Sequence, residues 1–501
     1  MIDKHILIVA ALLLGLCPEF GKAEMPFRNL DFSDLSDDSI TFPRSWAIMG
    51  DDCEESIFTD GQEDESLNHL RITIENPPDQ NVFCGISQRV DTEKYKGKEL
   101  HVSVKIRSLD AMPDEAGLWI RVDSRPGTFL AFRRTLLSSS IEMNDGEELT
   151  AVVPIYAAAD SIGFGIYLQG KGDVIVSDLE MSLQTPEASI SPRVMEYLSE
   201  IHKILKENSI KRKEIDWNDF WKDSLMDAAG RKTIADLHKA VPQILWRLGD
   251  RHSFFVPADK RQSNEPMSQT PAGRSIEGHL VNQDIGYLWM PGVSGEESIS
   301  QEYAESLRHT VESLSQKGAI AWLIDLRGNG GGNMWPMLAG IGPIIGQGAI
   351  GQFIDPDGES MQWSLEDFSS RLEGEVRTGV GPAGGGKKAM STQPVAILAG
   401  GTTASSGEAV VVAFRCRPRV KQFGAPTRGL STANNGTELT DGSLIALTVS
   451  TFADTCGNKY GGPLNPDTTA EPSEAEAPSF TDSAAEVAIT WLLEELGDNS
   501  R

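Results

Sequence analysis

Hydrophobic and polar residues alternate along several short segments in the first third of the chain. The clearest of these segments are Leu70–Ile74, Leu100–Ile106, Gly117–Val122 and Ile162–Leu168. Turn-forming residues such as Asn144-Asp145-Gly146 separate them. Alternation with a period of two is typical of strands that bury one face. The pattern predicts a jelly-roll-like β-sandwich over residues 24–184, and we expect Trp46 and Trp119 to lie in its core.

A helical spacing follows a linker over residues 185–191. Apolar residues recur at intervals of three and four and would share one helix face: Val194, Tyr197, Leu198, Ile201 and Leu205. Two further helices are predicted over residues 216–229 and 233–248. The second ends before Gly249, a residue that commonly follows a helix. Residues 192–274 are therefore predicted to form a helical subdomain.

Short apolar segments alternate with helical patterns in residues 275–501. Buried strands are predicted over residues 285–290, 319–324 and 394–399, and helices over 298–317, 334–341, 409–414 and 483–497. Strands that alternate with helices are typical of a layered α/β domain with a largely parallel sheet. We expect this part to be the largest domain of the chain.

The N-terminus has the pattern of a secretory signal. A short charged start precedes the apolar run Ile6–Leu16, and Gly21-Lys22-Ala23 is suited to cleavage after Ala23. The apolar run is too short to span a bilayer well, and no other run is long enough. We therefore predict a signal peptide over residues 1–23, no membrane span after its removal, and export to the periplasm or the cell exterior.

Charge and cysteine content narrow the possible partners. The formal net charge of −28 argues against binding to nucleic acid or to anionic lipid. Cys17 leaves with the signal, and the remaining cysteines fall into two groups. In an exported protein we predict one disulfide within each group, Cys53–Cys84 and Cys416–Cys456. Their spacing does not suit zinc, and we expect neither a metal nor a cofactor.

Two serines occupy a predicted strand-to-helix turn, Gly400–Glu408. Glycines permit a tight turn, and a helix start offers N–H groups and a positive dipole end to a developing oxyanion. The place suits a nucleophile. The alternative is an ordinary serine N-cap with a glutamate in the first helical turn, and the stretch alone does not distinguish the two.

Two further features could complete a catalytic site. A serine nucleophile needs a general base, and histidine is the usual choice. His252 follows the predicted helical subdomain, and His279 is the other candidate. The glycine turn Gly330–Gly332 follows a buried strand and could form an oxyanion hole or a purely structural turn. Its sequence fits neither a P-loop nor a dinucleotide fingerprint.

The motifs Asp325–Gly332 and Thr403–Glu408 resemble the paired signatures of the carboxyl-terminal processing serine peptidases, a family that includes the tricorn core and the nisin-resistance protease. Further segments resemble other elements of the family, in the right order: Gly249–Ser253, Phe423–Gly429, Asp441–Leu447 and Pro466-Asp467. The resemblance covers roughly residues 192–495. It implies a ClpP/crotonase-like core, in which helices pack on a layered sheet.

By position, the resemblance implies that Ser405 is the nucleophile and His252 the general base. The amides of Gly331 and Ser406, with Gly330 beside them, would form the oxyanion hole. Leu430 stands where members with a Ser-Lys dyad carry lysine, which favours a Ser-His dyad. Residues 460–465 contain no acid to serve as a third catalytic residue, and the segment before Ile285 is too short for a PDZ domain. The missing acid makes a Ser-His dyad the simplest arrangement, and the missing PDZ domain moves the resemblance towards the nisin-resistance type.

The sequence thus predicts an exported serine endopeptidase that cleaves peptide or protein substrates through an acyl-enzyme. One alternative is a weakly active or inactive homologue that only binds peptides. Another is a carbohydrate-binding or adhesion protein whose β domain has a glycan or protein partner. An esterase is disfavoured because no Gly-x-Ser-x-Gly motif is present. Substrate, cleavage specificity and oligomeric state are left open.

Overall fold

The computed structural model of the chain consists of two compact units. The first holds the described residues up to Val194 together with Asn218–Thr233, and the second holds Met195–Trp217 and the described residues from Ile234 onwards. The structure describes residues 27–35, 42–51, 53–60, 69–79, 81–109, 113–125, 128–138, 146–186, 190–262, 275–367, 369–380, 390–470 and 482–498. The predicted signal peptide lies outside these residues.

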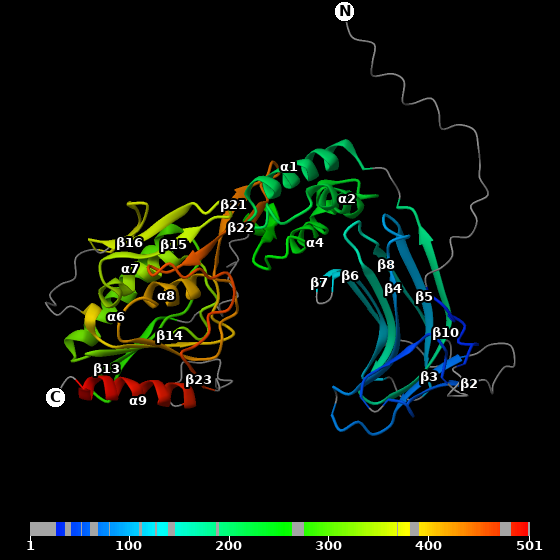
Figure 1. Ribbon diagram of the computed structural model, residues 1–501, viewed down its shortest axis with the longest axis horizontal. Coiled ribbons are helices and arrows are strands. Elements are labelled where there is room, and N and C mark those ends of the chain that lie inside the picture. The colour runs from blue at the N-terminus through cyan, green and yellow to red at the C-terminus, as the bar shows by residue number, and fades with distance from the viewer. Residues whose placement is uncertain are drawn as a thin grey trace, which may run out of the picture. The chain divides into compact units, whose positions relative to one another are not determined.

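Two five-stranded antiparallel sheets form the first unit (Figure 1). The first sheet has the order β1 (Ala47–Met49), β4 (Phe83–Asp91), β9 (Ser161–Gln169), β6 (Glu115–Arg125) and β7 (Thr128–Leu136). The second has the order β2 (Ile57–Asp60), β3 (His69–Ile74), β10 (Gly172–Gln184), β5 (Glu99–Ser108) and β8 (Glu147–Pro154). The predicted β-sandwich is confirmed.

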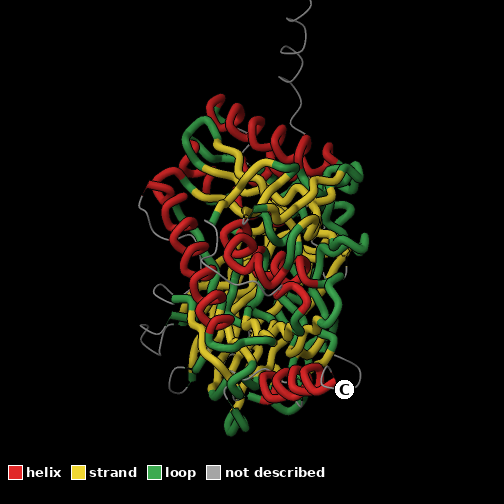
Figure 2. The backbone as a smooth tube through the Cα atoms, turned by 90° about the vertical axis from the view of Figure 1, so that its left-hand side faces the viewer, coloured by secondary structure: helices red, strands yellow, loops and turns green. Residues whose placement is uncertain are grey.

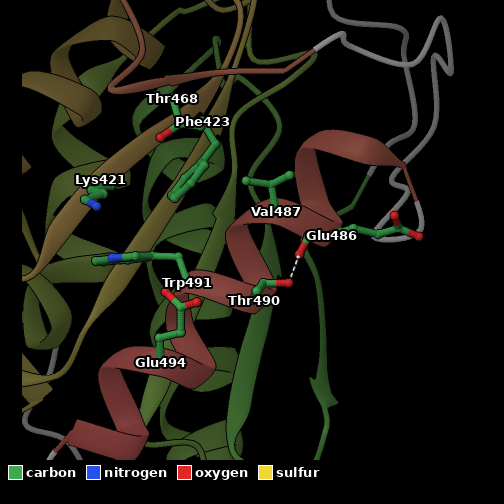
Figure 3. Close-up of a pocket in the computed structure, with 8 residues that line it drawn as sticks. All are labelled: Lys421, Phe423, Thr468, Glu486, Val487, Thr490, Trp491 and Glu494. Atoms are coloured by element: carbon green, nitrogen blue, oxygen red, sulfur yellow. Dashed lines mark hydrogen bonds between the residues drawn. The ribbon is translucent and has the colours of Figure 1, made fainter.

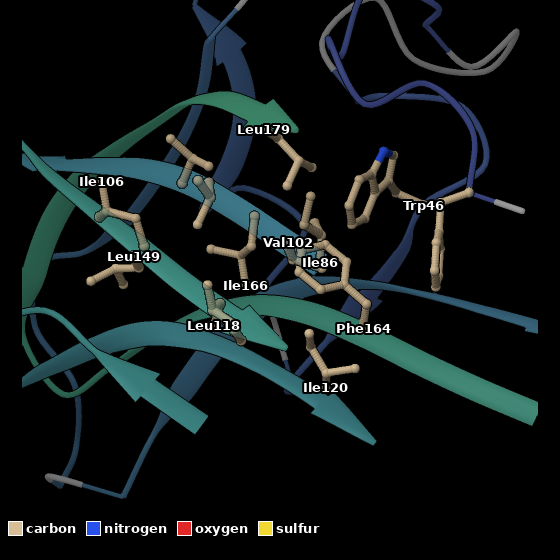
Figure 4. Packing of buried hydrophobic residues seen from close by; sticks show 14 of the residues in the cluster. Trp46, Ile86, Val102, Ile106, Leu118, Ile120, Leu149, Phe164, Ile166 and Leu179 are labelled. Atoms are coloured by element: carbon tan, nitrogen blue, oxygen red, sulfur yellow. The ribbon is translucent and has the colours of Figure 1, made fainter. Parts of the chain in front are cut away.

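The core of the sandwich lies between the inner faces of the two sheets (Figure 4). Leu118, Ile120 and Phe164 are fully buried there, as their alternation predicts. Trp46 also belongs to this core, with its ring centroid 5.9 Å from that of Phe164. The prediction for Trp119 was wrong. This residue lies between Leu118 and Ile120 on β6, so its side chain is on the opposite face of the sheet, where it is only half-buried.

Four helices follow the sandwich: α1 (Pro192–Asn208), α2 (Trp217–Ala228), α3 (Ile234–His238) and α4 (Val241–Trp246). Most of α2 belongs to the first unit, where its Asp223 and Asp227 accept hydrogen bonds from the backbone of Ala157 and the hydroxyl of Tyr156. Residues 192–274, predicted to form one helical subdomain, are therefore divided between the two units. The helix predicted over residues 233–248 is interrupted, because proline lacks the N–H that would continue it and Pro242 lies in the first turn of α4.

A six-stranded sheet forms the centre of the second unit. Its order is β12 (Glu277–Val281), β13 (Ile285–Trp289), β14 (Ala321–Asp325), β19 (Val395–Ala399), β20 (Val420–Gly424) and β23 (Thr468–Thr469). All pairs are parallel except β12 with β13. The central strands β13, β14 and β19 are buried on both faces, which explains their continuous apolar runs.

Helices cover both faces of this sheet. On one face lie α6 (Glu297–Gln316), α7 (Met334–Ile345) and α8 (Ser406–Phe414), and on the other lies α9 (Ser483–Asp498). Both views place α9 at the outside of the unit, beside the C-terminus (Figure 1 and Figure 2). The layered α/β core is as predicted.

A second, antiparallel sheet packs on the far side of α7 and α8. Its order is β11 (Phe254–Val256), β22 (Leu444–Ala453), β15 (Gly348–Ile354), β16 (Ser360–Glu366), β17 (Ser369–Leu372) and β18 (Glu375–Gly379), with β21 (Thr432–Glu438) also paired to β22. Its Phe353, Trp363 and Phe452 share one core with the three helices. The short elements α5 (Ala258–Gln262) and η1 (Met390–Thr392) complete the fold.

Candidate active site

Ser405 occupies the turn between β19 and α8, as the sequence predicts. Its backbone has φ +51° and ψ −115°, a conformation that residues with a side chain rarely adopt. Such conformations cost of the order of 1–3 kcal/mol and persist only where surrounding contacts hold them. Ser405 is the N-cap of α8 and forms a capping box with Glu408, but its backbone differs from that of an ordinary N-cap, which is usually extended.

Glu408 supplies those contacts. Its buried carboxylate accepts the N–H of Ser405 at 2.8 Å, those of Gly429 and Leu430 at 3.1 and 2.9 Å, and the hydroxyl of Thr427. Burial raises the pKa of Glu408, although each of these bonds opposes the shift. The first turn of α8 is thereby joined to the segment that contains Leu430.

The glycine turn after β14 lies directly against Ser405. A Cβ atom at Gly331 would stand 2.8 Å from the Cβ of Ser405 and 3.3 Å from the amide nitrogen of Ser406. Gly331 and Gly332 have φ of +106° and +110°, and Ser406 donates its hydroxyl to the carbonyl of Gly332 at 2.6 Å. Only a residue without a side chain fits between the two turns at position 331.

Asn329, which sequence reasoning missed, shapes the glycine turn. Asn329 is fully buried. Its backbone carbonyl accepts the N–H of Ala404 at 3.0 Å, and its side-chain amide donates to the carbonyl of Met290 at 3.0 Å. Its Oδ1 accepts the N–H of Gly331 at 3.1 Å. In this structure the predicted donor Gly331 therefore bonds within its own turn, whereas a Cβ at Gly330 would meet open space.

The charged residues of the same motif have structural roles. Asp325 is fully buried and accepts the hydroxyl of Tyr287 at 3.0 Å and the guanidinium of Arg327 at 2.7 Å. Arg327 also pairs with Asp482, which precedes α9 and accepts an N–H from its first turn. Burial raises the pKa of Asp325, and Arg327 opposes that shift. This cluster ties the glycine turn to the C-terminal helix.

His252 lies in a turn between α4 and β11. The carboxylate of Asp250 accepts the backbone N–H groups of His252 and Ser253 at 2.9 and 2.8 Å, and Arg251 between them has φ +60°. The amide of Asn434 donates to the carbonyl of His252 at 2.8 Å. The imidazole is therefore carried by a backbone that is bonded on both sides.

Thr432 is the partner of the His252 ring. Its Oγ1 lies 2.7 Å from Nδ1 of His252. Burial lowers the pKa of His252 to about 4, so the ring is neutral at neutral pH. Sequence reasoning looked for an acid and missed this threonine. Thr432 follows Leu430, the position at which Ser-Lys members carry lysine, by two residues.

A short backbone path connects the histidine with the serine turn. Thr432 donates its N–H to the carbonyl of Leu430 at 2.8 Å, and the N–H of Leu430 donates to Glu408, which also binds the N–H of Ser405. The ring of His252 is thus bonded to this segment directly, and the backbone of Ser405 is connected to it through Glu408. His279, the other candidate base, pairs instead against Tyr287, with ring centroids 4.8 Å apart.

Within the described residues, one cluster has the composition of a metal site, formed by Cys416, Asp454 and Cys456. Its two cysteines are joined in a disulfide, so they offer no thiolate. The second disulfide joins Cys53 and Cys84. Both pairings are those the sequence predicts. None of the described helices is long and apolar enough to cross a bilayer.

A pocket of about 390 Å³ lies on the α9 side of the parallel sheet (Figure 3). Trp491 from α9 and Phe423 from β20 form apolar walls, and the ammonium of Lys421 lies 5.2 Å from the Trp491 ring centroid. None of the predicted site residues lines this pocket.

Comparison with known proteins finds a family match within this unit. Residues 284–470 match the model of peptidase family S41. The chain is 24% identical over 309 residues to the nisin-resistance protein of Lactococcus lactis subsp. lactis, which covers 61% of this chain and 89% of that protein. It is 29% identical over 152 residues to the carboxy-terminal processing protease CtpA of Bacillus subtilis (strain 168), covering 30% of this chain and 28% of the protease.

Among solved structures, a lipoprotein from Streptococcus agalactiae aligns with a TM-score of 0.48 at 22% identity, covering 61% of this chain and 98% of the lipoprotein. The family match spans the strands and helices that carry both Ser405 and the glycine turn. The match to peptidase family S41 covers residues 284–470 of this chain.

Proposed function

We propose that the protein is an exported serine endopeptidase in which Ser405 is the nucleophile and His252 the general base. The observation that carries the proposal is the contact between the two turns, in which only a glycine at position 331 fits against Ser405. A strained serine, a glycine turn and a helix start lie together, and this is the arrangement that acyl transfer requires.

The hydrogen bond of His252 indicates its tautomer. If Nδ1 carries the proton and donates to Oγ1 of Thr432, Nε2 has the lone pair that takes the proton from Ser405. Thr432 then orients the ring as a carboxylate does in a Ser-His-Asp triad, but without a charge. The absence of an acid in residues 460–465 is compatible with this arrangement.

Ser405 would attack the carbonyl carbon of a peptide bond, and the oxygen would become an oxyanion. We assign its stabilisation to the N–H groups of Ser406 and of the glycine turn. Gly330 can contribute directly, and Gly331 contributes once its N–H turns from Asn329 to the oxyanion. His252 then protonates the leaving amine, and water hydrolyses the acyl-enzyme.

The test compares two neighbouring serines. Ser405→Ala removes the nucleophile, and we expect cleavage of a peptide library, followed by mass spectrometry, to fall by about 10⁴-fold or more. Ser406→Ala is the matched control, since it keeps the backbone N–H and loses only the bond to Gly332. A fluorophosphonate should label the wild type and not Ser405→Ala. Cleavage retained by Ser405→Ala would refute the assignment, and a wild type that binds but never cleaves peptides would indicate an inactive homologue.

Export is part of the same proposal. It rests on the signal-like N-terminus and on two disulfides, which form and persist in oxidising compartments. The chain would then act in the periplasm or outside the cell. Fractionation of cells that express the full chain would locate it, and a mature N-terminus at residue 24 would establish removal of the signal.

A further inference from the structure

The outer face of the sheet β1-β4-β9-β6-β7 carries a second group of residues that the peptidase chemistry does not use. Trp119 lies at its centre, on β6, and pairs with Gly165 of β9 on one side and Arg134 of β7 on the other. Paired residues of an antiparallel sheet share one face. Its sequence neighbours Leu118 and Ile120 point into the core (Figure 4).

The neighbouring strand leaves room for this tryptophan. A Cβ at Gly165 would lie 2.6 Å from the indole nitrogen, and a Cβ at Gly163 would lie 3.2 Å from the six-membered ring. The indole therefore rests across two glycines of β9. A half-buried tryptophan set against the backbone of a sheet forms an apolar platform backed by the strand beneath it.

Arginines surround the platform. Arg134 is opposite Trp119, Arg121 is two residues along the same strand, and Arg89 lies across β9. Their side chains are 47%, 38% and 52% exposed. The acids that pair with them are turned inwards. Asp123 is 1% exposed and holds Arg89 and Arg121 at 2.7 and 2.8 Å.

A second ion pair, between Glu115 and Arg134, lies at the other end of the face. The carboxylate of Glu115 is 27% exposed and accepts the guanidinium of Arg134 at 3.0 Å together with the hydroxyl of Tyr167. The guanidinium groups are thus the more exposed partners of these ion pairs. The whole protein carries −28, and Asp91, two residues from Arg89 on β4, is an exposed acid on the same face. Arginines fixed in this way keep guanidinium donors in place for a carboxylate.

An exposed phenylalanine extends the apolar surface. Phe132 is 44% exposed and pairs with Arg121 across β6 and β7, which makes it the diagonal neighbour of Trp119. Diagonal neighbours in an antiparallel sheet are roughly 7–8 Å apart. The two rings can therefore contact neighbouring sugars of one chain.

We propose that this face, with Trp119, Phe132, Arg89, Arg121 and Arg134 as its contact residues, binds an acidic polysaccharide. The apolar C–H face of one pyranose ring stacks on the indole, and the carboxylate of a uronic acid bonds to Arg121 or Arg134. A rigid aromatic ring flanked by oriented guanidinium groups matches both the apolar face and the negative charge of such a sugar. The site would bring the proposed peptidase to uronate-rich surfaces.

The experiment uses the full mature chain and two matched polymers, polygalacturonate and its carboxyl-reduced, neutral derivative. Affinity electrophoresis at low salt should show retardation of the wild type by polygalacturonate at concentrations at least tenfold lower than by the reduced polymer. Trp119→Ala should weaken binding to both polymers at least tenfold. Arg134→Gln should weaken binding to polygalacturonate alone.

Trp246→Ala is the matched control, since Trp246 is a solvent-exposed tryptophan on α4, outside the sandwich. Peptidase activity should be unchanged in all three variants, which shows that they fold and separates this proposal from the catalytic one. Trp119→Phe keeps an aromatic ring and should retain part of the binding. The proposal is overturned if the wild type binds neither polymer, as expected of a protein-docking face, if it binds the neutral polymer equally well, or if Trp119→Ala binds like the wild type.

Discussion

Acidification tests the role of His252 most directly. A general base must be unprotonated, so the acid limb of kcat/KM reports its pKa in the free enzyme. Burial lowers the pKa of His252 from 6.5 to about 4, and the negative charge of Asp250 opposes the shift only in part. We therefore expect kcat/KM to be level from pH 7 to about pH 5 and to fall tenfold per pH unit below about pH 4.

The lowered pKa of His252 also makes the stability of the fold depend on pH. One pKa unit corresponds to about 1.36 kcal/mol, so the fold favours the neutral ring by roughly 3 kcal/mol at most. The unfolded chain binds this proton near pH 6.5, before the folded chain does. The free energy of unfolding should therefore be unaffected by His252 above pH 6.5 and should decrease as the pH falls from 6.5 to about 4.

A fluorogenic peptide assay from pH 3.5 to 8 at constant ionic strength would measure the profile, with circular dichroism at each pH to confirm that the protein is folded. An acid limb near pH 6.5 in folded protein would refute the reasoning, because it would place the base in a solvated environment. A His252→Gln variant with the same profile and rate would refute the assignment of the base itself.

Three further predictions concern the residues around the reacting groups. Thr432→Val removes the partner of Nδ1, and the loss of about 1–3 kcal/mol should lower kcat about 5- to 150-fold with KM nearly unchanged, whereas Thr432→Ser should retain activity. Gly331→Ala forces a Cβ within 2.8 Å of the proposed nucleophile and should lower kcat/KM about 100-fold, while Gly330→Ala, which meets open space, should be tolerated. Glu408→Gln places an amide NH₂ among N–H donors, and urea denaturation at pH 7 should show a loss of about 1–3 kcal/mol, so an unchanged midpoint would contradict the anchoring role.

The face of β6 that carries Trp119 could have been predicted from the sequence, but the prediction made was wrong. In Gly117–Val122 the tryptophan is in phase with Gly117 and Arg121 and out of phase with Leu118 and Ile120. The period-two rule therefore placed it on the outer face, while its hydrophobicity suggested the core. The glycines of β9 that accommodate it follow it by more than forty residues, and no local pattern connects them.

The antiparallel sheet of the peptidase unit was harder to predict. Strand β16 reads Ser-Met-Gln-Trp-Ser-Leu-Glu, and β21 reads Thr-Ala-Asn-Asn-Gly-Thr-Glu. Met361, Trp363 and Leu365 of β16 alternate with polar residues, but the strand is short and partly exposed, and β21 has no apolar period. Pairing with neighbouring strands therefore defines both strands.

The sequence by itself determined the sandwich, the buried parallel strands and the serine turn, because each depends on the spacing of apolar residues or on glycine within a short stretch. The tertiary structure alone decided what surrounds the reacting groups. It brought Gly331 against Ser405, 74 residues later, and Thr432 against His252, 180 residues earlier. Such contacts arise when strands from distant segments pair. No local sequence pattern indicates which side chains this pairing will bring into contact.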